Sequence, residues 1–207
     1  MRVLLIGFGP FPGAPFNPSA ALIRALARRG RPAFAEIVRT THVFDTAYAA
    51  VDRDLPRLFA DAPDIVLMFG LAGRRLHLCI ETRARNAVSV LLPDASGHRP
   101  HRGVIAPGGP AAIRGVAPFA RLLGAVRGGA VPARLSRDAG RYLCNYAYWR
   151  ALERSQRRRP LVQFVHIPPV RISPRPFRAR RRRTPSLHRL VSAAENLLLA
   201  LTAASRR

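Results

Sequence analysis

Short, continuous apolar runs constrain the fold of this 207-residue chain more than any other feature. Residues 3–7, 64–70 and 161–167 are mostly apolar and end at or just before glycine or proline. Such runs are typical of strands that are covered on both faces. Residues 187–201 instead carry apolar side chains at the spacing of a helix that packs on a core. Strands that alternate with helices predict one α/β domain over residues 1–207, a three-layer α/β/α structure with a largely parallel, mixed central sheet.

Local signals set the expected boundaries of the elements. Asn17 before Pro18 predicts a capped helix start. We expect Asp45 to cap a second helix that runs toward residue 61, and Pro56 to break or kink it. The other expected elements are strands over residues 36–43 and 130–136, and helices over residues 114–126, over residues 139–154 with Asp138 or Ser136 near the cap, and from Thr184 onward.

The charge of the chain is strongly one-sided. Thirty-five basic residues stand against 11 acidic ones, for a formal net charge of +24, and every basic residue is arginine because the sequence contains no lysine. Such a charge attracts polyanions but says little about the fold. The arginines are scattered except in residues 171–183, an Arg- and Pro-rich run that we expect to be an exposed loop. A genome that favours arginine codons explains this scattered charge better than a dedicated nucleic-acid function does.

The number of cysteines and the N-terminal residues indicate the cellular compartment in which we expect the protein. Two cysteines, Cys79 and Cys144, do not make a disulfide framework in a chain of this length. The N-terminal residues show no signal-peptide pattern, and no apolar stretch is long enough to span a bilayer. These observations predict a cytoplasmic protein without a membrane span.

The loop over residues 7–13 resembles the start of a dinucleotide site, because Gly-x-Gly follows a predicted strand. Pro10 and Pro12 remove two backbone donors, and Pro12 takes the place of the third glycine that such a site needs. We therefore reject a nucleotide site. Phe8 and Phe11 could line a flat apolar slot there, although from the residues alone ordinary core positions explain them better.

Three further residues are candidates for chemistry. Cys144 lies in the first turns of a predicted helix, where backbone N–H groups and the helix dipole stabilise a thiolate. His166 lies at the C-terminal end of a predicted strand and could serve as base to a cysteine. Glu81 is one of few carboxylates in a basic chain. Taken singly, each has an ordinary reading: a buried thiol, a core histidine and a surface ion pair.

Other polar or aromatic groupings give weaker signals. His98 and His101 are spaced for a metal ion, but no third or fourth ligand is evident. Tyr142, Tyr146 and Trp149 follow helical spacing and read as core residues. We expect neither a metal nor a cofactor.

Taken together, five segments resemble the pyroglutamyl-peptidase I (pyrrolidone-carboxylate peptidase) family of cysteine peptidases. The resemblance covers nearly the whole chain, and the segments stand in the order and at the spacing of the family. They are GFGPFPGAPFNPS at residues 7–19, GLAGRR at 70–75, ETRARN at 81–86, SRDAGRYLCN at 136–145 and FVHIP at 164–168.

The resemblance implies a Cys–His–Glu triad made of Cys144, His166 and Glu81, which would cleave peptides after an N-terminal pyroglutamate through a thioacyl-enzyme. It also implies which residues hold the lactam ring. The ring would lie against two phenylalanines, its amide would meet an asparagine and the backbone at residue 71, and three more residues would close the pocket. These substrate-binding residues are Phe8, Phe11, Asn17, Leu71, Leu92, Tyr142 and Leu143.

The sequence departs from the family pattern at three positions near this pocket. Leu71 replaces a usual glutamine, Arg74 a usual glycine, and Leu91 a usual arginine. The alternative these departures leave open is a divergent family member with weak or altered amidase activity.

The resemblance also bears on partners. It implies a homo-oligomer, a dimer or tetramer, although the like charge of the copies opposes close association. A different class of alternative is a basic protein that binds nucleic acid or an anionic membrane through residues 171–183. No aromatic platform or recognised nucleic-acid motif accompanies that charge, so we rank this alternative below the peptidase.

Overall fold

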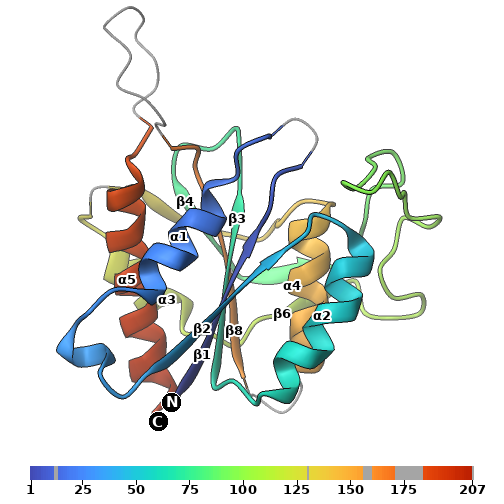
Figure 1. Cartoon of the computed structure of the whole chain (residues 1–207). Coiled ribbons are helices and arrows are strands. Elements are labelled where there is room, and N and C mark those ends of the chain that lie inside the picture. The colour runs from blue at the N-terminus through green and yellow to red at the C-terminus, as the bar shows by residue number, and fades with distance from the viewer. Residues whose placement is uncertain (12–13, 130, 156–159, 171–183, 207) are drawn as a thin grey trace, which may run out of the picture.

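The buried strands expected from the apolar runs form the centre of the molecule (Figure 1). The computed structural model describes residues 1–11, 14–129, 131–155, 160–170 and 184–206, so the predicted Arg-rich loop at 171–183 lies outside the described residues. A six-stranded sheet has the order β2-β1-β3-β8-β4-β7. Its strands are β1 (Arg2–Phe8), β2 (Val38–Phe44), β3 (Ile65–Leu71), β4 (Leu78–Glu81), β7 (Ala133–Ser136) and β8 (Leu161–Ile167).

The sheet is mixed but largely parallel, as the sequence predicts. β2, β1, β3 and β8 pair in parallel, whereas β4 runs antiparallel to β8 and parallel to β7. A separate two-stranded sheet pairs β5 (Arg83–Arg85) with β6 (Ala112–Arg114). β4 was not anticipated, because its four residues lack turn signals that would separate them from the preceding loop.

Helices cover both faces of the sheet, which gives three layers (Figure 1). One face packs against α1 (Pro18–Ala27), α3 (Phe119–Val126) and α5 (Leu187–Ser205). The other packs against α2 (Tyr48–Ala60) and α4 (Leu143–Arg154). A short 3-10 helix covers Pro32–Phe34. Burial on both faces is the physical reason why β1, β3 and β8 are almost wholly apolar.

The start of α2 differs from the prediction, and Pro56 does not break the helix. Its N-cap residue is Ala47, not Asp45, and the carboxylate of Asp94, distant in sequence, accepts the Tyr48 N–H at 3.0 Å. Pro56 lies inside the helix without ending it. Proline removes one backbone donor, and because Pro56 is exposed, water can satisfy the carbonyl left without a partner.

Three other helices begin later than predicted, and one of them is α5, which starts at Leu187 after the N-cap Ser186 rather than at Thr184. α4 starts at Leu143, because Asp138 caps a turn rather than the helix: its side chain accepts the Gly140 N–H at 3.0 Å, and Gly140 has a positive φ of 85°. α3 starts at Phe119, and Arg114 belongs to β6. By contrast, Asn17 caps α1 as expected, accepting the Ser19 N–H.

Candidate functional site

The register of two antiparallel strands brings Glu81 and His166 together. Cys79 of β4 lies opposite His166 of β8, and Glu81 follows two residues later, so its side chain points to the same face of the sheet. The His166 Nδ1 and the Glu81 Oε1 are 2.9 Å apart. Because Nδ1 is held by the carboxylate, Nε2 is the ring nitrogen that remains for a further partner.

Cys144 reaches the same place from the helix layer. It is the second residue of α4, so it lies in the first turn, where backbone N–H groups have no acceptor within the helix. Gly70 lies beside His166 in the β3–β8 register, and a Cβ atom on Gly70 would come within 2.7 Å of the Cys144 Sγ. Gly70 therefore leaves the space that the sulfur occupies over the sheet.

The histidine is buried between its two partners. Burial by itself would lower the pKa of the His166 imidazole, but interaction with Cys144 and Glu81 outweighs burial and raises the pKa to about 9. Glu81 is fully buried, and its Oε2 has no hydrogen-bond partner in the described part of the chain. The arrangement thus favours an imidazolium between two groups that can carry negative charge.

Arg75 is a neighbour of this group that the sequence alone did not single out. Its Nη1 lies 3.6 Å from the Glu81 Oε1 and donates to the Cys79 Sγ at 2.9 Å. Its position in the GLAGRR segment, directly after β3, was the only signal in the sequence. Arg75 places a cation beside a carboxylate that is otherwise removed from water.

A cavity of about 220 Å³ opens above Cys144 and His166. Six of the seven predicted substrate-binding residues line it, whereas Leu92 does not and leaves 53% of its surface exposed. Thr46 and Ala139 also line it, and neither was predicted. Thr46 follows the C-terminal end of β2, which lies two strands from β3 in the sheet. Its place just after a predicted strand was the one sequence signal that could have pointed to it. The predicted residues that line the cavity are Phe8, Phe11, Asn17, Leu71, Tyr142 and Leu143.

Hydrogen bonds hold the polar lining residues in place. The Asn17 amide donates to the Gly9 carbonyl at 3.1 Å while its oxygen accepts from Ser19. The Tyr142 hydroxyl donates to the Pro93 carbonyl at 2.8 Å, and the Tyr142 ring lies 6.3 Å from that of Phe11. Asn17 and Tyr142 are therefore held in position by the protein itself, without a ligand.

The described residues hold neither a metal-binding cluster nor a membrane-spanning helix. No three His, Cys, Asp or Glu side chains there are grouped so that they could hold a metal ion. No helix in the described ranges has the length and apolar character needed to cross a membrane.

Comparison with known proteins agrees with this geometry. A family model described as pyroglutamyl peptidase matches residues 1–206. The pyrrolidone-carboxylate peptidase of Vibrio vulnificus is 31% identical over 198 residues, which cover 96% of this chain and 91% of that protein. That of Erwinia tasmaniensis is 34% identical over 81% of this chain and 78% of its own.

Solved structures lead to the same family. The crystal structure of pyroglutamyl peptidase I from Bacillus amyloliquefaciens is 27% identical and superposes with a TM-score of 0.80 over 98% of this chain and 97% of that one. The pyrrolidone carboxyl peptidase of Fervidobacterium islandicum is also 27% identical, with a TM-score of 0.85 over 98% and 99%. The chain therefore belongs to the pyroglutamyl peptidase family.

Proposed function

We propose that this protein is a thiol peptidase that removes pyroglutamate from the N-terminus of peptides. Cys144 would be the nucleophile, His166 the acid and base, and Glu81 the group that orients the imidazole. The observation that carries the proposal is the 2.9 Å contact between Glu81 and His166 beside Cys144, at the floor of a small cavity. The relatives named above, which are called pyrrolidone-carboxylate peptidases, support the substrate.

The chemistry follows from the placement of these groups. The Cys144 thiolate attacks the pyroglutamyl carbonyl while the His166 imidazolium holds the proton. Among the described residues no side chain caps the start of α4, so its backbone N–H groups can donate to the oxyanion that forms. His166 then gives its proton to the leaving amine, and a thioacyl-enzyme remains. Water attacks that thioester and gives a proton to His166; the C–S bond then breaks, which releases pyroglutamate and restores the Cys144 thiolate and the His166 imidazolium.

The cavity suits a small uncharged ring. Its lining includes the aromatic rings of Phe8 and Phe11, and no described lining residue is an aspartate or glutamate that could pair with an N-terminal ammonium. A free amino terminus would lose its hydration there without gaining a counter-charge, whereas the lactam of pyroglutamate carries no charge. This difference is the basis on which we expect selectivity.

The proposal is tested with purified protein and a fluorogenic pyroglutamyl amide. Cys144→Ala should lower kcat/KM by at least about 10⁴-fold, because the attacking atom is lost. Cys79→Ala is the matched control and should keep activity within a few-fold. A folded wild-type protein that leaves this substrate intact would refute the proposal.

The family match does not favour a divergent amidase, but one residue of the cavity bears on the range of substrates. Leu71 lines the cavity where the family usually has glutamine, so the lining is more apolar than the family pattern. A panel of N-terminally blocked peptides separates the two candidates. Preference for a blocking group other than pyroglutamate would favour the divergent amidase.

We also propose that the protein acts in the cytoplasm as a homo-oligomer. The two free thiols at Cys79 and Cys144 support a reducing compartment. Sedimentation at several salt concentrations tests the assembly, because screening of the like charges should favour it.

A further inference from the structure

The main chain of Glu81 lies where the pairing of two strands stops. The last residue pair of β4 and β8 is Ile80 with Val165, and the same register would next join Glu81 to Phe164. Beyond the end of this pairing a buried carbonyl must find hydrogen-bond donors elsewhere, because leaving it unpaired is costly. The carbonyl of Glu81 takes its donors from side chains.

Two fully buried side chains donate to this one carbonyl. The Tyr148 hydroxyl of α4 lies 3.1 Å from the Glu81 carbonyl oxygen, and the Gln163 amide of β8 lies 3.0 Å from it. Side chains alternate along a strand, so Gln163 belongs to the sheet face of Val165, which α1, α3 and α5 cover, whereas Tyr148 packs on the other face. The main chain of Glu81 is therefore held from both faces of the sheet.

The Gln163 amide takes the place of the missing backbone pair. Its nitrogen donates to the Phe164 carbonyl at 2.6 Å as well as to the Glu81 carbonyl. An amide nitrogen carries two hydrogens, so one side chain can serve a carbonyl on each strand. Gln163 thus joins β4 to β8 at the residue that supplies the carboxylate of the site.

Tyr148 ties the same carbonyl to the helix of the nucleophile. It lies four residues after Cys144 in α4, on the same side of that helix. Gly115 makes room for its hydroxyl, since a Cβ atom on Gly115 would come within 2.7 Å of the Tyr148 oxygen. Burial and the negative charge of Glu81 raise the pKa of Tyr148, so the hydroxyl keeps its proton and donates.

Cys144, His166 and Glu81 come from three different elements, so the distances among them depend on how those elements are joined. We propose that Tyr148 is a positioning residue of the peptidase site, which with Gln163 fixes the Glu81 main chain against α4 and so holds the carboxylate at His166. The inference rests on the proposed function. A misplacement of about 1 Å at a reacting group can cost about 10²-fold in rate. Neither Tyr148 nor Gln163 lines the cavity above Cys144, so substrate binding should not depend on them directly.

The test removes the hydroxyl and keeps the ring, in Tyr148→Phe. With the fluorogenic pyroglutamyl amide, kcat should fall about tenfold or more while KM stays within about threefold. A second readout needs no substrate: the ring of His166 is titrated by NMR in the full chain. Glu81 is one cause of its raised pKa of about 9, so a carboxylate held less closely should lower the titration midpoint by about half a pH unit or more.

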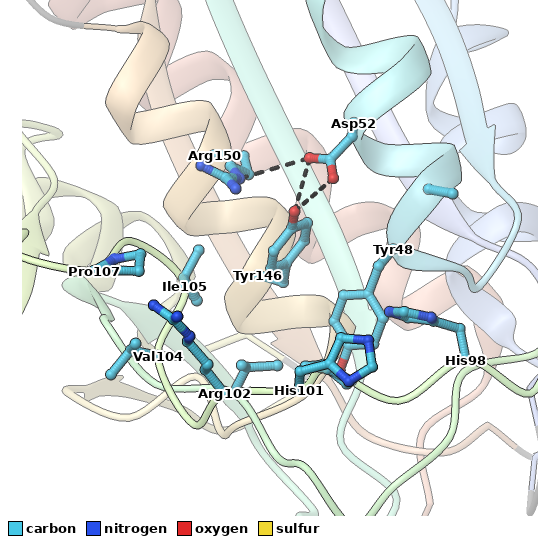
Figure 2. Close-up of a pocket in the computed structure, with 13 residues that line it drawn as sticks. Tyr48, Asp52, His98, His101, Arg102, Val104, Ile105, Pro107, Tyr146 and Arg150 are labelled. Carbon is cyan, nitrogen blue, oxygen red and sulfur yellow. Dashed lines mark hydrogen bonds and ion pairs between the residues drawn. The ribbon is translucent and has the colours of Figure 1, made fainter.

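Tyr146→Phe is the matched control, because it makes the same change in the same helix. The Tyr146 hydroxyl donates to Asp52 of α2 at 2.7 Å, on the side of α4 that Figure 2 shows, and not to the carbonyl of Glu81. This variant should lose thermal stability through the missing hydrogen bond. Its kcat should stay within about twofold of the wild type, and the midpoint of His166 should not move.

Gly115→Ala reaches the same hydrogen bond without changing the tyrosine. The added methyl group would displace the Tyr148 oxygen from the Glu81 carbonyl, so kcat and the His166 midpoint should both fall. In the Tyr148→Phe background the displaced oxygen is gone, and the added methyl group should cause little further loss. Equal fold losses in the two backgrounds would overturn the role given to the hydroxyl. Should Tyr148→Phe not fold, Gly115→Ala decides by the same two readouts.

The outcomes are separable from the proposed peptidase activity. A lower kcat with unchanged KM and a lower His166 midpoint in Tyr148→Phe, without these changes in Tyr146→Phe, supports the positioning role. An unchanged kcat or an unchanged midpoint in a folded Tyr148→Phe overturns it, whatever the loss of stability. A wild type that cleaves no pyroglutamyl amide would refute the peptidase, and the NMR titration would still decide whether Tyr148 holds Glu81 at His166.

Discussion

The two cysteines lie near the same carboxylate but in opposite settings. Cys144 begins α4, lines the cavity and interacts with His166. Cys79 lies inside β4, is 1% exposed, and accepts a hydrogen bond from Arg75 at 2.9 Å. Burial raises the pKa of the Cys79 thiol, and the Arg75 guanidinium lowers it again only in part.

The difference teaches that a nearby cation is not what distinguishes a nucleophile. Cys79 has a guanidinium at 2.9 Å, yet it is buried away from the cavity, and its hydrogen-bond partner among the described residues is Arg75 rather than a base. Cys144 has access, a histidine and the unpaired N–H groups of a helix start. Access to substrate and a histidine that can carry the proton together distinguish Cys144 from Cys79.

Among the residues around Cys144, the largest change should follow from Glu81→Gln, which keeps the size of the side chain and removes its charge. The amide can hold the imidazole in the wrong tautomer, and the imidazolium loses its counter-charge, so kcat/KM should fall about 10³- to 10⁴-fold. Cys144 would then approach the inertness of Cys79. Activity within tenfold of the wild type would show that Glu81 has no part in the reaction.

Stability should depend on pH through His166. Its pKa is about 9 in the folded protein against an ordinary 6.5, so the folded state binds this proton more tightly than the unfolded chain. The stabilisation is complete below about pH 6.5 and is lost as the pH rises to about 9. Urea unfolding across this window should show a falling free energy of unfolding. Glu81→Gln removes one cause of the raised pKa, so the decrease should be smaller in that variant.

Arg75→Gln should have a moderate effect. The change removes a cation 3.6 Å from the Glu81 carboxylate, and because the Arg75 side chain is 37% exposed, solvent screens part of its charge. We expect kcat to fall about tenfold with KM nearly unchanged, since Arg75 does not line the cavity. Arg75→Lys should restore part of the loss. A rise in KM alone would argue for a role in binding instead.

The smallest effect should come from Leu71→Gln, which restores the residue usual in the family. One added hydrogen bond to the lactam should lower KM by about two- to tenfold for the pyroglutamyl amide. Leu92→Gln makes the same chemical change outside the cavity and should alter KM less than about twofold. Equal effects of the two changes would show that residue 71 does not contact the ring.

The central strands and the layer order were predictable because burial on both faces leaves a plain apolar run, as in β1 and β3. Helix starts were harder. Asp94, far along the chain, satisfies the start of α2, and Asp138 serves a turn before α4 instead of its cap. Where these helices begin depends on tertiary contacts, which a local sequence pattern does not reveal.

The site residues likewise separate into those that the sequence could predict and those that it could not. Cys144 and His166 follow from position, a helix start and a strand end. Their approach to Glu81 depends on the antiparallel pairing of β4 with β8, which the short apolar segment of β4 did not reveal. Arg75 was missed for the same reason, because only the folded strand shows which carboxylate it faces.

Alkylation tests the contrast between the two thiols most directly. Native protein is treated with limiting iodoacetamide, activity toward the pyroglutamyl amide is followed, and the modified peptides are mapped by mass spectrometry. Modification of Cys144 should match the loss of activity one for one, with Cys79 unmodified while the protein is folded. Full activity after complete modification of Cys144, or inactivation that tracks Cys79, would contradict the account.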